Sequence, residues 1–170
     1  MAAGDLKLVY AASANMAVNT GLDELATSAT WVAGWESAII DNTTTLYEDI
    51  LVSGKITVGN SGVTAGQIRV YAVAMLDDST WPPPFDGTPS AETIIGVVLA
   101  GHASLLAVIS PDTTVDQVYY FGPKSLAALF GGLCPAKCLL FITHNTTDAL
   151  AAAGGNQITT KGVYSNVAQS

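Results

Sequence analysis

The sequence predicts an all-β protein: a Greek-key or jelly-roll β-sandwich of about eight strands, with an N-terminal arm and one short helix. Short segments rich in Val, Ile, Thr and Tyr recur along the whole chain, and clusters of Gly, Asn, Asp and Pro separate them. No sequence repeat of fixed period is present, which disfavours a solenoid or a propeller. Long connections such as residues 77–90 favour a Greek-key layout over a plain meander.

The first half of the chain begins with an apolar strand at 6–10. The segment 11–17 fits either a helix or an extended arm, and propensity does not decide between them. Strands are expected over 31–40 and over 47–58, where Gly54 predicts a bulge or bend. With 170 residues the chain suits one elaborated domain. We expect residues 1–30 to form an arm and first strand, packed on or exchanged with a neighbour, and 31–170 to form the sandwich.

The second half contains further short apolar or β-branched segments. They lie at 67–76, 94–99, 104–109, 117–121, 138–143 and 157–164. The segment 67–76 is apolar on both faces, which is typical of a central strand that is covered on each side. The helix is expected at 124–130, because Leu126, Leu129 and Phe130 share a helical face and Gly131 follows as a stop.

Composition favours a protein that acts within an assembly. Only 12% of the residues are charged, about half the usual share, so part of the surface is expected to be covered in use. The net charge is −8, and the six basic residues are scattered singly, which disfavours binding to nucleic acid or anionic lipid. No stretch is long enough to span a membrane, and the N-terminus has no signal-peptide pattern. We therefore expect synthesis in a cytoplasm without export.

Catalytic motifs are missing from the sequence. His102 and His144 are the only histidines, neither lies in an acid-rich segment, and the Gly-x-Ser-x-Gly elbow does not occur. No Gly-rich phosphate-binding motif is present. We expect no enzymatic activity and no cofactor, and each histidine is expected at a strand end, hydrogen-bonded to backbone.

Two groups of residues offer weak metal-binding patterns. Cys134 and Cys138, together with the two histidines, contain ligand types that zinc prefers, but the usual paired spacing is absent. Two reduced thiols packed as small hydrophobes are the favoured interpretation, and a disulfide would need a turn at Pro135. Carboxylates near 77–86 lack the spacing of a calcium loop. We therefore expect no metal site.

Contact residues are expected in the arm and in the proline-rich loop. Aromatic side chains are common anchors of interfaces, and Trp81 and Phe85 flank a run of three prolines. These two rings could bind a neighbouring protein, stack on a sugar, or fold back over their own core. The proposed interface residues are Leu6, Leu8, Tyr10, Trp81, Pro83 and Phe85.

The C-terminal segment resembles the ending of a group of small phage virion proteins. The residues that carry the resemblance are Phe141–Leu150, Gly155–Ile158 and Gly162–Tyr164. The middle of the chain is similar in order, through Trp31, Asp49–Ile56, Ile68–Ala72 and Trp81–Asp86. The resemblance implies a jelly-roll-like decoration (cement) protein of a tailed phage, located on the capsid exterior and assembled in the host cytoplasm.

That resemblance also implies partners and leaves alternatives. The partners would be the major capsid protein and further copies of the chain, with a trimer favoured over a dimer. One alternative is a carbohydrate- or host-binding module of a head fibre or tail, with Trp31, Trp35 and Trp81 as candidate stacking surfaces. Another is a structural component of the tail or neck.

Overall fold

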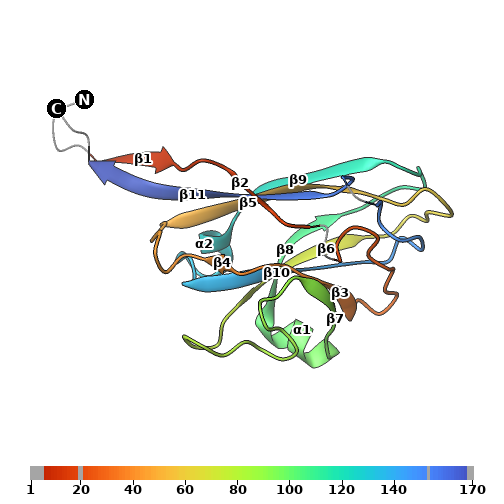
Figure 1. Ribbon diagram of the computed structural model, residues 1–170, viewed down its shortest axis with the longest axis horizontal. Helices are drawn as coiled ribbons and strands as arrows, with labels where there is room; N and C mark the ends of the chain where they lie inside the picture. The colour runs from red at the N-terminus through yellow and green to blue at the C-terminus, as the bar shows by residue number, and fades with distance from the viewer. Residues whose placement is uncertain (1–5, 19–20, 153, 168–170) are drawn as a thin grey trace.

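The chain forms a sandwich of two antiparallel sheets (Figure 1). The computed structural model describes residues 6–18, 21–152 and 154–167. In the first sheet, sheet A, the strand order is β1–β11–β5–β9, and β2 also pairs with β11. Its strands are β1 (Leu6–Tyr10), β2 (Ala14–Met16), β5 (Asp49–Thr57), β9 (Val118–Ser125) and β11 (Gln157–Val167).

The second sheet, sheet B, has the order β7–β3–β10–β6–β8, and β4 also pairs with β10. Its strands are β3 (Ala33–Glu36), β4 (Ile40–Asp41), β6 (Ile68–Ala74), β7 (Ser90–Thr93), β8 (Ala103–Ile109) and β10 (Lys137–His144). The chain passes repeatedly between the sheets, for example from β5 to β6 and from β8 to β9. Sheet neighbours are therefore distant in sequence, as in Greek-key sandwiches, and the predicted all-β sandwich is confirmed.

The main core lies between the two sheets. Ile50 and Ile158 of sheet A and Val70 and Ile142 of sheet B belong to one buried cluster, as does the fully buried Trp35. Alternation along each strand produces this arrangement, because every second side chain points into the sandwich. Leu22 and Leu25, from the connection before β3, also belong to this cluster. The chain before residue 31 therefore contributes to the same core.

A second, smaller core covers the outer face of sheet B. Tyr71, Leu139 and Phe141 pack there against Phe85 and Ile94, which lie outside the sheet. The covering elements are the loop 77–89 and helix α1 (Gly96–His102), which lie beyond sheet B in Figure 1. Both faces of β6 are consequently buried, as its sequence predicts. No described element covers the outer face of sheet A in this way.

Several elements differ from the sequence predictions. The apolar run 94–99 does not form a strand: β7 ends at Thr93, and α1 follows. Leu99 packs into the second core from this helix, so tertiary packing overrides the β-branched composition. The segment predicted at 31–40 is two short strands, β3 and β4. The helix predicted at 124–130 is confirmed in its central turn as α2 (Leu126–Leu129).

The bend predicted at Gly54 is also present. The register between β5 and β9 shifts between Val52 and Gly54. A side chain at position 54 would collide with the Phe121 ring and the backbone oxygen of Gln157, both 2.7 Å from where a Cβ would lie. Only glycine allows this close approach to β11. Among the described residues, no helix is long and apolar enough to cross a membrane.

Candidate functional site

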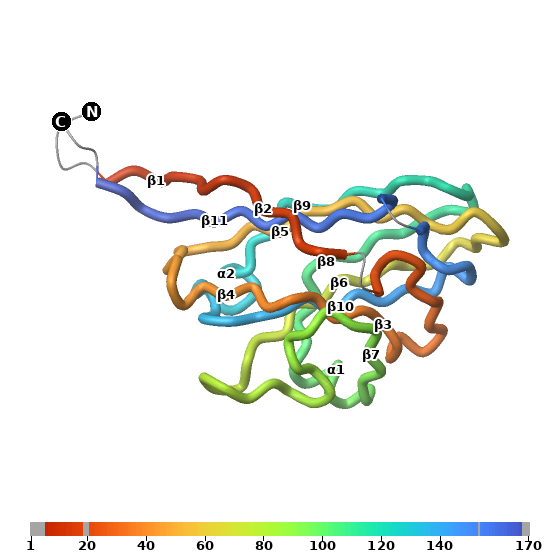
Figure 2. Tube along the Cα trace, viewed as in Figure 1, coloured from red at the N-terminus to blue at the C-terminus, as the bar shows by residue number. Residues whose placement is uncertain are grey.

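The most prominent surface feature is a two-stranded ribbon formed by β1 and the end of β11. The ribbon extends away from the body of the sandwich, and β1 and the last residues of β11 lie side by side along it (Figures 1 and 2). Its register pairs Leu6 with Val167 and Tyr10 with Val163. The 11–17 segment is an extended arm, since β2 pairs with β11 rather than forming a helix.

One face of the ribbon is apolar and exposed. Leu6, Leu8 and Tyr10 are 72%, 57% and 56% exposed, and Val167 is 52% exposed. Cross-strand partners share a face of a sheet, so Leu6 and Val167 lie together on this face with Leu8 and Tyr10. The structure therefore brings together the three arm residues that the sequence proposes for an interface.

The ribbon also has an open backbone edge. Strand β1 is at the edge of sheet A and pairs only with β11 among the described strands. A two-stranded ribbon alone is marginally stable in water, and an exposed edge is a template for further pairing. The exposed apolar face and the open edge together are characteristic of an element that a partner covers.

The three proposed loop residues have different environments. Phe85 is only 5% exposed, and its ring meets the Phe141 ring edge to face with 5.6 Å between centroids. Trp81 is half-buried against the same cluster, whereas Pro83 is exposed. Of the sequence alternatives, folding back over the protein's own core describes Phe85. A contact made by this loop stays a prediction, and it would use Pro83 and the exposed part of Trp81.

Hydrogen bonds to Glu36 connect this loop to β3. Its side chain is fully buried, and its Oε1 accepts hydrogen bonds from the backbone N–H of Asp86, at 3.0 Å, and of Gly87. The other oxygen, Oε2, is buried and has no hydrogen-bond partner among the described residues. Burial raises the pKa of Glu36 to about 7, even though the two N–H donors act in the opposite direction. The sequence interpretation missed Glu36; its one signal is a carboxylate between Trp35 and Ser37 in an apolar strand.

The two histidines have different environments. His144 is fully buried; its Nε2 donates to the carbonyl of Leu25, so Nδ1 accepts from the Thr146 hydroxyl, each at 2.9 Å. Burial lowers the pKa of His144 and favours the neutral ring. This side chain holds the 22–28 connection against β10, which confirms its expected place at a strand end. His102 is exposed and is the last residue of α1, so its predicted place at a strand end is wrong.

Both cysteines are free thiols. Cys138 is buried in the main core, and Cys134 is half-buried beside it. Burial raises the pKa of Cys134 to about 11 and that of Cys138 to about 12, so both thiols stay protonated at neutral pH. Both side chains pack as small hydrophobic groups, which is the interpretation that the sequence favours. Within the described ranges, no group of three or more His, Cys, Asp or Glu side chains is placed to hold a metal ion.

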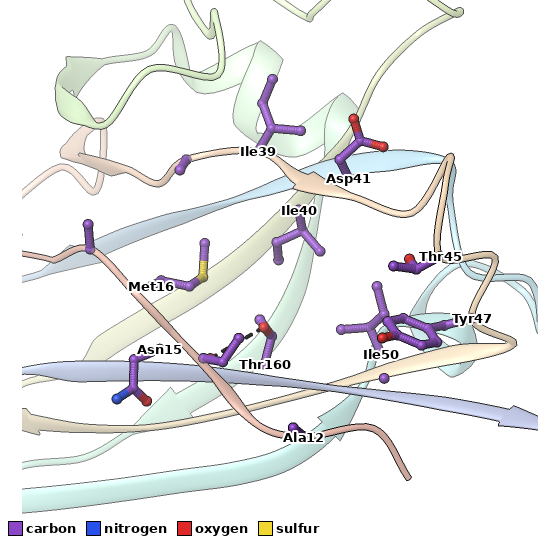
Figure 3. A pocket seen from close by; sticks show the side chains of 14 residues that line it. Ala12, Asn15, Met16, Ile39, Ile40, Asp41, Thr45, Tyr47, Ile50 and Thr160 are labelled. Carbon is purple, nitrogen blue, oxygen red and sulfur yellow. Dashed lines mark hydrogen bonds between the residues drawn. The ribbon is translucent and has the colours of Figure 1, made fainter. Parts of the chain in front are cut away.

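A groove of about 380 Å³ opens at the root of the ribbon, between β2 and β4 (Figure 3). Its lining is mainly apolar, and Met16, Ile40, Ile50 and Tyr47 point into it, while the Asp41 carboxylate lies at its rim. The groove contains no histidine or cysteine.

Comparison with known proteins adds no relative. No known family model matches the chain, and no curated protein sequence is significantly similar to it. The candidate site is therefore defined by the ribbon and its surroundings alone.

Proposed function

We propose that this chain is a structural virion protein of a tailed phage that decorates the outer surface of the capsid and stabilises contacts between capsomers. The observation that carries the assembly role is the projecting ribbon, whose apolar face of Leu6, Leu8 and Tyr10 is exposed in the isolated chain. The location on a phage capsid is supported by the sequence resemblance described above.

The physical task of such a protein is to add buried contact area across a junction that internal pressure pulls apart. A specific contact buries about 1,600 Å², and repetition over a symmetric shell multiplies modest contacts into avidity. A rigid body is required, and the double-layered core on sheet B supports one. Exposed leucines that would be costly in a monomer become useful where a partner covers them.

Direct imaging tests the proposal. Particles assembled with the wild-type chain should show it on the exterior of the head, in contact with two or more capsomers, at a resolution that traces the ribbon. Particles assembled with Leu6→Ser/Leu8→Ser should show reduced occupancy at the same place. Density in the neck, in the tail or nowhere on the particle would contradict the proposal.

The carbohydrate-binding alternative loses its proposed aromatic platform. Trp35 is fully buried, and the Trp31 ring is covered by the Arg69 guanidinium, whose carbon lies 3.8 Å from the ring centroid. Trp81 packs on the second core. These three rings do not form an open surface on which a sugar could stack.

A further inference from the structure

The charges of this protein are segregated between its two sides. The strands of sheet A contain four of the six basic residues, Lys7, Lys55, Lys124 and Lys161, and one of the fourteen acidic residues, Asp49. Asp49 is half-buried, and its Oδ1 accepts hydrogen bonds from the backbone N–H of Ile50 and of Ala127 in α2. Within the bounds of its strands, sheet A therefore carries more basic than acidic residues in a chain of net charge −8, while the exposed Glu48, next to β5, accepts a hydrogen bond from the Ser165 N–H of β11.

The uncovered outer face of sheet A combines two of these lysines, Lys55 and Lys161, with the tyrosines Tyr10 and Tyr120. Tyr10 and Lys161 line one shallow hollow of about 410 Å³, and the Lys161 Nζ lies 5.5 Å from the Tyr10 ring centroid. Lys55 and Tyr120 line a second hollow of about 330 Å³. Ser53 and Thr159 line both, so the two hollows lie next to each other. Tyr120 is 75% exposed.

The opposite side of the sandwich is acidic. There the loop over sheet B presents the exposed residues Asp77, Asp78 and Asp86, beside the exposed Pro83 and Leu76. Hydrogen bonds from Ser79 and Thr80 lower the pKa of Asp77 and keep it ionised. This loop belongs to the layer beyond sheet B, whereas the ribbon and the lysines belong to sheet A, so the two charged surfaces face away from each other (Figure 1).

We infer that the outer face of sheet A binds the acidic 77–86 loop of a second copy of this chain, in a head-to-tail contact. The occupant is argued from charge complementarity: a basic, aromatic and apolar face needs an acidic partner with apolar side chains, and the chain itself supplies one. Tyr10, Tyr120 and the ribbon leucines would cover Pro83 and Leu76, while Lys55 and Lys161 would meet the carboxylates. The inference rests on the assembly role proposed above.

A head-to-tail contact has a consequence for symmetry. The two contacting surfaces differ, so the interface is heterologous, and successive copies either close into a ring or continue as a filament. In a two-fold dimer each surface of one copy would have to meet the other surface of its partner at the same time. Because the two surfaces face away from each other, this contact cannot make such a dimer. The predicted trimer is one ring of this kind.

Charge reversal on each surface, separately and together, tests the contact. The first variant carries Lys55→Glu and Lys161→Glu; the second carries Asp77→Asn, Asp78→Lys and Asp86→Asn, which keep the local hydrogen-bond acceptors at positions 77 and 86. Each variant alone should self-associate at least about tenfold more weakly than wild type in sedimentation at low ionic strength. An equimolar mixture should regain association between unlike copies, in open or even-membered assemblies, because each altered surface then meets an oppositely charged one.

Matched controls place the same kind of charge change elsewhere. Lys7→Glu lies on the other face of the ribbon, and Glu24→Lys with Asp116→Asn lies in a separate hollow of about 450 Å³; neither should change association beyond the general effect of net charge. The inference is overturned if wild type is monomeric, if the lone variants associate like wild type, or if the mixture stays dissociated. Capsid binding by a monomer would overturn the head-to-tail contact and leave the proposed function intact. A ring that forms but never binds capsids would support the head-to-tail contact and contradict the proposed function.

Discussion

At the scale of single residues, the burial of Glu36 makes stability depend on pH. Its pKa rises from 4.5 to about 7 on folding. Between these values the folded protein keeps the proton and the unfolded chain loses it, so the folded state binds more protons. Stability from this group is therefore present below about pH 4.5 and falls as the pH rises towards about 7.

We expect Glu36→Gln to remove that loss, on the order of 2 kcal/mol. The free energy of unfolding is measured in denaturant at about pH 5 and about pH 8, and the wild-type value minus the variant value should decrease from the lower pH to the higher. The lowered pKa of His144 makes the free energy of unfolding fall as the pH falls, and this effect is the same in wild type and in Glu36→Gln. Glu24→Gln, at an exposed site, serves as the control. Equal pH dependence in wild type and Glu36→Gln would contradict the assignment.

A second prediction at this scale concerns the contribution of Phe85 to stability. Because its ring is buried against Phe141, Phe85→Ala should lower the free energy of unfolding by about 3 kcal/mol. Pro83→Ala, two residues away and exposed, should change it by less than about 0.5 kcal/mol. Thermal unfolding followed by circular dichroism measures both. A neutral Phe85→Ala would mean that the loop does not pack on sheet B.

At the scale of elements, the ribbon should matter for association and little for folding. Leu6 and Leu8 are exposed, so Leu6→Ser with Leu8→Ser should leave the free energy of unfolding of the isolated chain within about 0.5 kcal/mol of wild type. Self-association, measured by light scattering, should weaken. Lys7→Ser, on the opposite face of β1, is the matched control. If both variants associate like wild type, the apolar face is not a contact surface.

The elements also show where local sequence is sufficient. Strands β5, β6 and β10 follow from apolar residues at matching parity or on both faces, because burial on a sheet requires that spacing. The run Ile94–Leu99 has the same composition and forms α1 from Gly96. The pairing between β3 and β7 ends where Ala33 pairs with Thr93, the last residue of β7. Beyond Thr93 the backbone therefore has no strand of sheet B with which to pair. Composition alone does not contain that information.

At the scale of the whole molecule, one core joins both sheets and the 21–30 connection. Leu22, Ile50 and Ile142 belong to the same buried cluster, so the two sheets and this connection are expected to unfold together. Tryptophan fluorescence and far-ultraviolet circular dichroism should report one coincident denaturant transition. Two separated transitions would indicate that the arm, or the layer over sheet B, is a separate unit.

The sequence by itself determined the sandwich, its long loop, its central strands and the apolar parity of Leu6, Leu8 and Tyr10, since these follow from period-two burial and turn residues along a local stretch. Tertiary structure alone decided that Phe85 faces inward, that Glu36 is buried beneath a loop fifty residues away, and that Lys55 and Lys161 lie near Tyr10 and Tyr120 on the outer face of sheet A. These features depend on which distant strands become neighbours, and pairing between strands far apart in sequence is not encoded in any local pattern.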